Sequence, residues 1–497
     1  MGFEIDQVVN AGPAMTPDAD VGLLATKDIG VGESVLEMER WIAVLDSARL
    51  ADTCSHCFDT QYLRDSQPNE KPLDLKLCAG CKTVRYCRKD CQVQSWRAFH
   101  KYECKIYKKL YPKILPTSAR AVMRIVLLIT NRANDPGGQM PLFHRLTDHR
   151  LKIKKERPEH YENLELCAKA VHEYSNTDLS IEEIILYFAK LDTSAFTLTC
   201  PFGDPIGIAV HPNAGFCNHS CSPNTSVDFD GSRVFARALC KISKGEQIYI
   251  SYIEATDPYA VRQRELSSRY FFKCKCSKCK KGDKGREDQF LRQLGQADSA
   301  IIQDAQKQVT TLLEAVKTGN SAEDSISKLR SGMSILRKTS LWPLTRQPYV
   351  KLRGELAVSL LEAKNFESAF IQLAIIYLRI DPILYPQSWH PILTCHKWRF
   401  VKLLMHLSGT GELGNAEGID LAKYKFDLHI LIYSILLNMN ATLCNELPTV
   451  QQMAYGALLD FAHPQLTTAA ILPMIDLEWK KLDAMVEEAL QIDEASI

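Results

Sequence analysis

The sequence has little that would place the protein in a membrane or outside the cell. It contains no run of about 18 apolar residues, the length needed to cross a bilayer. Its first residues show no charged segment followed by an apolar one, which would indicate a secretory leader. We therefore expect a protein of the cytoplasm and nucleus that does not bind membranes.

An excess of charge of one sign is also missing. Lys and Arg number 60 against 59 Asp and Glu, so the formal net charge is +1. Such a chain lacks the overall basic surface of a typical nucleic-acid-binding protein. Residues 76–113 are a local exception, with eleven Lys or Arg against two acidic residues. We expect a solvated basic surface there and keep nucleic-acid binding as an alternative.

The apolar pattern of the first half indicates strands, then helices, then strands again. Residues 22–26 and 34–38 are short apolar runs separated by a Gly-containing turn, which predicts two strands. Helical spacing predicts helices near 119–133 and 180–191, the second beginning with a capping box of Ser180 and Glu183. Further strands are predicted at 226–229, 233–240 and 246–253, the first two joined by an Asp230-Gly231 hairpin turn.

The second half lacks a repeat of fixed period, yet its pattern is helical. Residues 280–288 are charged and contain Gly, which predicts a linker. Beyond it, 349–363, 366–380 and 426–440 read as helices, with Asn365 at an N-cap position. A length of 497 residues also exceeds one hydrophobic core. We expect two to four domains, the last an antiparallel helical array or a simple bundle.

The cysteines are numerous and clustered, and seven of the 17 lie between Cys54 and Cys104. Without a secretory leader, close pairs indicate metal binding rather than disulfides. This cluster has four short pairs: Cys54-x2-Cys57, Cys78-x2-Cys81, Cys87-x3-Cys91 and His100-x3-Cys104. Eight ligands saturate two tetrahedral zinc ions, so both sites are predicted to be structural, and the segment is expected to fold only with metal.

A second cluster, Cys274, Cys276 and Cys279, is one ligand short of a tetrahedral site. Cys240 lies in a strand pattern, and both Cys200 and Cys217 suit buried positions for a small residue. Cys221 lies in the turn-rich stretch GFCNHSCSPN at 215–224 and is free to present its sulfur. All four remain candidates for the missing ligand on this reasoning alone.

Together the motifs resemble a known family. The segment YCRKDCQVQSWRAFHKYEC at 86–104 resembles a MYND zinc finger. The segments GFCNHSCSPN, KGEQIYISY and CKCSKC, in this order, resemble a SET domain. A MYND finger inserted into a SET domain and followed by helices is similar to the SMYD family of SET and MYND domain-containing protein lysine methyltransferases. The implied fold class is α+β: a β-rich SET domain with an inserted MYND zinc finger and a helical, TPR-like C-terminal domain.

The resemblance divides the chain into six expected segments. These are the SET N-terminal part at 1–50, the MYND zinc finger at 51–104, the helical SET insert at 105–195, the SET core at 196–253, the post-SET zinc segment at 254–282 and the helical C-terminal domain at 289–497.

The resemblance also implies how the ligands share three zinc ions. It assigns Cys54, Cys57, Cys87 and Cys91 to one ion of the finger, and Cys78, Cys81, His100 and Cys104 to the other. It assigns Cys221 to the third ion, with Cys274, Cys276 and Cys279.

The activity implied by the resemblance is methyl transfer from S-adenosylmethionine to a lysine of a histone or another protein. Tyr252 is the expected catalytic residue, because a phenol orients the reacting groups without carrying charge near neutral pH. Tyr249 and Tyr270 are expected to line the substrate channel. The expected cofactor-binding residues are Gly22, Ser194, Asn218, His219 and Phe272.

The expected partners are a protein substrate with its target lysine and, at the MYND finger, proline-containing peptides. We expect a monomer. No acid–base dyad is found, and none is required, because a desolvated channel beside a positive sulfonium disfavours the ammonium form of lysine.

Two departures from the family pattern support an alternative. Gly-x-Gly-Leu-Arg is replaced by Asp20-Val21-Gly22-Leu23-Leu24, and Asn-Ser-Phe by Ser194-Ala195-Phe196. Both changes remove polar groups that could bind the cofactor. The alternative is a catalytically weak or inactive scaffold that binds partner proteins.

Overall fold

The computed structural model describes residues 8–9, 11–14, 21–61, 73–131, 135–293, 295–317, 319, 321–388, 390–411, 413–442, 447–462 and 468–495. Asp20, the first residue of one departure from the family pattern, lies outside these ranges.

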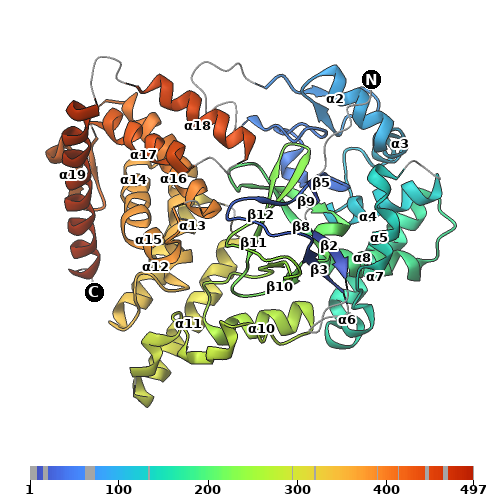
Figure 1. The fold of residues 1–497 in the computed structure, drawn as a ribbon, viewed down its shortest axis with the longest axis horizontal. Coiled ribbons are helices and arrows are strands. Elements are labelled where there is room, and N and C mark those ends of the chain that lie inside the picture. Colours follow the sequence, from blue (N-terminus) through green and yellow to red (C-terminus); the bar gives the residue numbers. More distant parts are fainter. Residues whose placement is uncertain are drawn as a thin grey trace. The chain divides into compact units, whose positions relative to one another are not determined.

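The chain divides into two compact units (Figure 1). The first comprises Met1–Ile253, Glu265–Cys274 and Leu447–Thr449, and the second comprises Glu254–Arg264, Lys275–Glu446 and Val450–Ile497. The six boundaries expected from the sequence stay a prediction.

The strands of the first unit are short and form several small sheets. Three segments of the chain supply these strands. The strands are β1 (Val8–Val9), β2 (Ala11–Ala14), β3 (Gly22–Ala25), β4 (Ser34–Glu39), β5 (Ile42–Leu45), β6 (Lys76–Leu77), β7 (Arg85–Tyr86), β8 (Phe196–Thr199), β9 (Pro205–Val210), β10 (Asn218–His219), β11 (Thr225–Asp230), β12 (Arg233–Ala238) and β13 (Tyr249–Ile250).

Sheet pairing brings distant parts of the chain together. The largest sheet has the order β1-β4-β12-β11, a second has the order β5-β9-β8, and β2 pairs with β3. The predicted hairpin is confirmed, because β11 and β12 pair with Asp230 opposite Arg233 and Gly231 takes a φ of 55° in the turn. A positive φ is unfavourable for residues with a Cβ, which explains the glycine.

Two expectations for the strands need correction. Of the predicted strand 246–253 only β13 forms, since Gln247 makes an isolated bridge to Leu24 of β3 and the Tyr252 N–H bonds to the side chain of His219. The stretch 215–224, expected to be irregular, contains β10, which pairs in parallel with β13. The strand predicted at 22–26 forms as β3, which begins at Gly22.

The helices of the first unit are α2 (Lys89–Ser95), α3 (Lys101–Leu110), α4 (Thr117–Thr130), α5 (Met140–Arg145), α6 (Arg150–Glu156), α7 (Pro158–Ser175), α8 (Ile181–Ser194) and α9 (Pro212–Gly215). Trp96–His100 is a π-helix between α2 and α3. The capping box that begins α8 is confirmed, with Ser180 and Glu183 bonded reciprocally. Helix α4 contacts α7, α8 and β5, so it lies at the centre of this unit (Figure 1).

One continuous apolar core joins the finger to the strands and α4. Five predicted cysteine ligands and Tyr86 of the finger, with Tyr107 of α3, belong to the same buried cluster as Val122 and Ile125 of α4 and Leu36 of β4. Loss of the finger's fold would therefore remove packing from the rest of the unit.

Helices make up most of the second unit. They are α11 (Gln296–Lys317), α12 (Ala322–Lys338), α13 (Tyr349–Glu362), α14 (Phe366–Ile375), α15 (Asp381–Leu384), α16 (Pro391–Ser408), α17 (Leu428–Thr442), α18 (Pro448–Asp460) and α19 (Thr468–Ala495), with the strands β14 (Asn415–Ala416) and β15 (Ile419–Asp420). Helix α10 (Tyr259–Tyr270) precedes them.

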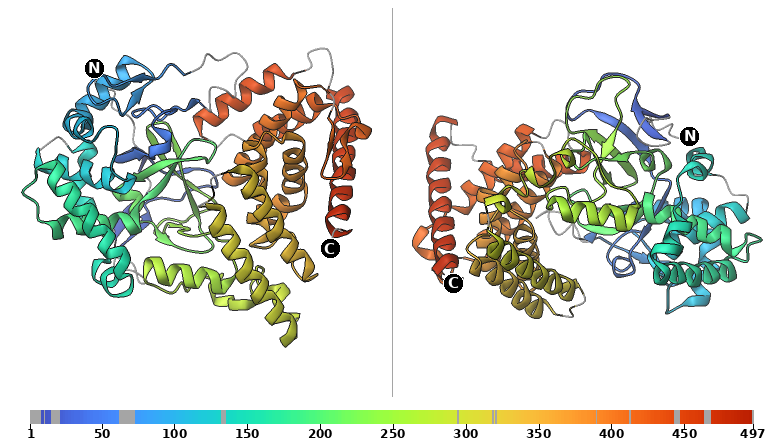
Figure 2. Two further views of the ribbon diagram at one scale, coloured as in Figure 1. Left: turned by 180° about the vertical axis from the view of Figure 1, so that it is seen from behind. Right: turned by 90° about the horizontal axis from the view of Figure 1, so that it is seen from below.

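Consecutive helices α11 to α14 contact one another in chain order, as expected for an array of helices (Figure 2). The three predicted helices are confirmed as α13, α14 with its π-helical continuation Ile376–Ile380, and α17. Asn365 caps α14 by accepting from the Ser368 N–H. The predicted linker at 280–288 is partly structured, since Cys279–Lys284 form a 3-10 helix.

No helix in the described part of the chain is both long enough and apolar enough to cross a membrane.

Candidate functional site

Twelve predicted ligands lie in three groups, and the ligand atoms within each group are within 4.8 Å of one another. The groups are the same as those implied by the family resemblance: Cys54, Cys57, Cys87 and Cys91; Cys78, Cys81, His100 and Cys104; Cys221, Cys274, Cys276 and Cys279.

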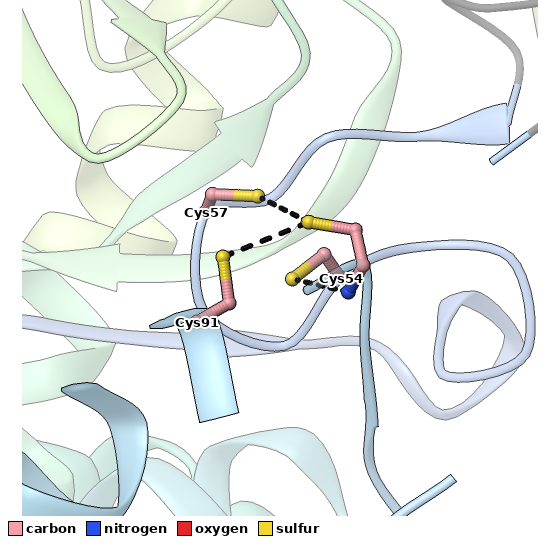
Figure 3. Close-up of side chains that lie close together, drawn as sticks. Cys54, Cys57 and Cys91 are labelled. Atoms are coloured by element: carbon pink, nitrogen blue, oxygen red, sulfur yellow. Dashed lines mark hydrogen bonds between the residues drawn. The ribbon is translucent and has the colours of Figure 1, made fainter. Parts of the chain in front are cut away.

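The spacing of the sulfurs suits tetrahedral coordination. Zinc–sulfur bonds of about 2.3 Å place tetrahedral sulfurs about 3.8 Å apart. The Cys57 and Cys87 sulfurs are 3.5 Å apart, and those of Cys87 and Cys91 are 3.6 Å apart. Figure 3 shows the thiols of Cys54, Cys57 and Cys91 pointing toward one another. Each group could hold one metal ion, and thiol-rich sets of four favour zinc.

The other candidates for the fourth ligand of the third group lie outside it. Cys240 is exposed, whereas Cys200 and Cys217 are buried. Burial raises the pKa of Cys217 to about 12, so this thiol keeps its proton near neutral pH. Cys221 is the residue whose sulfur joins Cys274, Cys276 and Cys279.

A buried charge pair supports one histidine ligand of the finger. Nδ1 of His100 lies 3.8 Å from Oε2 of Glu103, and the Arg124 guanidinium donates to both Glu103 oxygens at 2.6 and 3.0 Å. Arg124 also donates to the Ala43 carbonyl of β5 at 2.6 Å. Burial alone would raise the pKa of Glu103, but Arg124 and His100 lower it to about 2. The carboxylate therefore orients the histidine and links the finger to α4 and β5.

Replacing Glu103 by glutamine is expected to destabilise the first unit by about 3 kcal/mol, because the buried Arg124 loses its counter-charge. We also expect the variant to lose one zinc ion per chain more readily on titration with a chelator, since charged groups beside a ligating histidine tune metal affinity. Thermal melting and zinc release measure the two effects.

Asp324→Asn is the matched control, since Asp324 pairs with Lys328 on the exposed side of α12. That change should alter stability by less than about 1 kcal/mol. If both variants melt at the same temperature, the Glu103–Arg124 pair does not stabilise the contact of the finger with α4 and β5.

The predicted cofactor residues meet where β10 and β13 pair. Asn218 lies opposite Tyr249, and its side-chain amide donates to the Val21 carbonyl at 3.2 Å, next to Gly22. Ser194 ends α8 and lies beside Gly215, three residues before Asn218. A Cβ built on Gly215 would lie 3.5 Å from the Ser194 Cβ. Segments separated by almost 200 residues therefore surround Asn218.

His219 connects the third cysteine group to Tyr252. The backbone N–H of Tyr252 donates to Nδ1 of His219 at 3.0 Å, so Nδ1 must accept and the ring proton lies on Nε2. Nε2 is 3.2 Å from the Cys221 sulfur and can donate to it. The imidazole thus holds the Tyr252 backbone in place relative to a metal ligand.

Tyr252 lies among aromatic rings. Its ring centroid is 5.2 Å from that of His219 and 4.9 Å from that of Tyr270. The Tyr252 hydroxyl donates to the Cys217 carbonyl at 2.5 Å, and the Tyr270 hydroxyl donates to the Tyr252 carbonyl at 3.3 Å. Burial raises the pKa of Tyr252, so its phenol is neutral at physiological pH.

The remaining two predicted residues flank this group. The Phe272 ring lies 5.9 Å from His219, so one face of the imidazole is covered by an aromatic side chain. Tyr249 is held through its hydroxyl, which donates to Gln247 Oε1 at 2.7 Å. The structure thus gathers all predicted cofactor and channel residues in one region, and their roles remain predictions.

Sequence reasoning missed Glu103 and Arg124. Two signals were available: Glu103 follows the ligand His100 by three residues, the spacing of one helical face, and Arg124 interrupts an apolar helix pattern. It also treated His219 only as a cofactor contact and did not predict its bond to Cys221.

Comparisons with known proteins agree with this arrangement. The SET domain family profile matches residues 20–253. A Schizosaccharomyces pombe protein named "SET domain and MYND-type zinc finger protein 6" is 26% identical over 76% of this chain and 68% of its own length. The Arabidopsis thaliana "Histone-lysine N-methyltransferase ASHR1" is 28% identical over 54% of each chain. The human "Histone-lysine N-methyltransferase SMYD3" is 28% identical over 42% of this chain and 50% of its own.

The matched segment thus spans about half the length of the latter two relatives. A solved structure described as the SET domain of LSMT bound to lysine and AdoHcy aligns over 97% of this chain and 87% of its own, at 13% identity with a TM-score of 0.24, a similarity too low to support an argument about the site. The family profile, the ligand groups and the named relatives lead to one conclusion: residues 20–253 match the SET domain family, and the chain is similar to proteins named for SET and MYND domains.

Proposed function

We propose that the protein is a protein-lysine N-methyltransferase that uses S-adenosylmethionine and carries three zinc ions. The observation that carries the proposal is the position of Tyr252, whose backbone is bonded to His219 and whose phenol lies against Tyr270 beside the Cys217 carbonyl. Several relatives named as lysine methyltransferases support the reaction class.

The residues around β10 fit such a cofactor. Bound S-adenosylmethionine supplies an activated methyl group on a positively charged sulfur. Within the described residues no donor reaches the Asn218 side-chain oxygen, so it can accept from the cofactor's amino group. The partly buried Phe272 offers an aromatic face for the adenine.

The chain's own groups position the lysine rather than transfer protons. The neutral phenol of Tyr252 orients the amine without adding charge. Tyr270 and the partly buried surroundings exclude water, and desolvation lowers the pKa of the target lysine from about 10.4. Most of the barrier is then overcome by holding the amine in line with the methyl group.

The catalytically weak scaffold remains the second candidate. Leu24 of β3 is apolar and Ser194 at the end of α8 is short, so neither supplies the longer polar side chain expected from the family.

Trp96, which is 45% exposed on the finger, supports binding of proline-containing peptides there, because proline-rich segments dock on aromatic surfaces. Residence in the cytoplasm and nucleus stays a prediction.

The test uses the zinc-loaded full chain. Calorimetry with S-adenosylmethionine is expected to show one binding site per chain, and a labelled-methyl assay over a protein extract should yield methylated lysine identified by mass spectrometry. A chain that binds no cofactor and labels no protein would be the scaffold instead.

A further inference from the structure

We propose that the site accepts an acidic segment of its substrate protein, with Asp or Glu residues flanking the target lysine. This inference rests on the proposed function and concerns the surface formed by Arg145 and by helix α6, hereafter the basic rim. Residues 145–157 hold six Lys or Arg against two acidic residues, whereas the whole chain has a net charge of only +1.

Contacts place the basic rim beside the candidate site. A Cβ built on Gly215 would lie 3.1 Å from the Leu146 side chain, so the segment between α5 and α6 packs against the end of α9. The His149 ring lies 5.3 Å from Phe271, the residue before Phe272. Helix α6 accordingly lies close to the end of α10 in both views of this region (Figures 1 and 2).

Two cations of the basic rim lie over aromatic residues next to the site. The Arg145 guanidinium is 5.7 Å from the Phe216 ring, and Phe216 precedes Cys217, whose carbonyl accepts from Tyr252. The Lys152 ammonium is 5.9 Å from the Phe271 ring. Both side chains are exposed, so their charge is directed to solvent at the edge of the site.

Nearby carboxylates are already paired with cations other than Arg145 and Lys152. Asp148 lies 3.6 Å from Arg150, and Glu265 lies 2.9 Å from Arg269. Asp192, whose charge acts on Tyr270, contacts His160 and lies 3.9 Å from Arg157.

Among the residues that the structure describes, no carboxylate lies within 4.0 Å of the Arg145 or Lys152 cations. Their charge remains available to a ligand. Because the target lysine itself approaches as a cation, a positive rim disfavours a basic substrate segment and favours one that brings carboxylates.

The test compares two peptides of equal length with one central lysine, one flanked by Asp and Glu and the other by Lys and Arg. With the zinc-loaded full chain and S-adenosylmethionine, we expect kcat/KM to be about tenfold higher for the acidic peptide at low salt, and the advantage to shrink as NaCl screens the charges. Fluorescence anisotropy of labelled peptides measures binding separately from methyl transfer.

The variant Arg145→Glu/Lys152→Glu should abolish or reverse this preference. The control Lys241→Glu/Lys244→Glu makes the same change in charge at two exposed positions outside the basic rim and should keep the preference. Circular dichroism and calorimetry with S-adenosylmethionine show whether each variant is folded and binds cofactor.

Equal use of both peptides, or a preference that survives in the Arg145/Lys152 variant, overturns the inference. If the acidic peptide binds through Arg145 and Lys152 but neither it nor any protein of an extract receives a methyl group, the docking surface stands and the proposed function fails. If neither peptide binds, the inference fails even when proteins of the extract are methylated.

Discussion

Replacing Tyr252 by phenylalanine is expected to lower kcat for lysine methylation by at least about a hundredfold, because the amine loses the group that orients it. The ring should stay in place, since the backbone N–H of Tyr252 still bonds to His219 and the ring still packs on Tyr270. The lost hydrogen bond to the Cys217 carbonyl should cost only about 1 kcal/mol of stability. Initial rates with a labelled methyl donor, together with calorimetry of cofactor binding, measure the effect.

Tyr187→Phe is the matched control for this experiment. Tyr187 is a buried tyrosine of the same unit whose ring packs on Phe143, 5.8 Å away. Removing its hydroxyl should leave kcat unchanged. A Tyr252→Phe enzyme that retains full kcat would show that the phenol has a structural role, and the assignment of Tyr252 as the catalytic residue would then be wrong.

Replacing Cys221 by serine is expected to reduce the zinc content from three ions per chain to two. The third group would keep only Cys274, Cys276 and Cys279, and a three-thiolate set leaves one position of a tetrahedral ion without a protein ligand. His219 would also lose the sulfur that accepts from its Nε2, so the Tyr252 backbone would no longer be tied to a metal ligand. We expect methylation to fall by about a hundredfold, the upper loss seen when ligand-supporting contacts are removed.

Cys240→Ser provides the control, because Cys240 is an exposed cysteine that belongs to none of the three groups. It should retain three zinc ions and full activity. Elemental analysis of the purified proteins counts the ions directly. Three ions in the Cys221→Ser protein, with cofactor binding unchanged, would contradict the proposed role of this cysteine.

Much of the site could be predicted from local spacing. The Cys-x2-Cys and Cys-x3-Cys pairs identify metal ligands because two thiolates two to four residues apart can reach one ion. The Asp230-Gly231 turn and the Ser180 capping box depend only on neighbouring residues, and the structure confirms both. The grouping of the ligands required the family resemblance, since spacing leaves several pairings open.

Other features could not be read from short segments. The bond from Asn218 to Val21 joins residues 197 positions apart, and the Arg124 bond to Ala43 joins residues 81 positions apart. Of the predicted strand 246–253 only two residues form a strand, because Gln247 makes an isolated bridge to Leu24 and the Tyr252 backbone bonds to the side chain of His219. Local propensity carries no information about such partners.

The sequence by itself determined the composition of the site: eleven thiols and one imidazole at ligand spacing, a tyrosine at position 252, and an amphipathic helical pattern beyond residue 289. Only the tertiary structure decided that His219 bridges Cys221 and Tyr252 and that Glu103 lies between His100 and Arg124. It also decided that Arg145 and Lys152 lie over aromatic rings at the edge of the site. The physical reason is that ligand spacing and helix periodicity are properties of neighbouring residues, whereas hydrogen bonds and charge contacts between distant segments exist only after the core has packed.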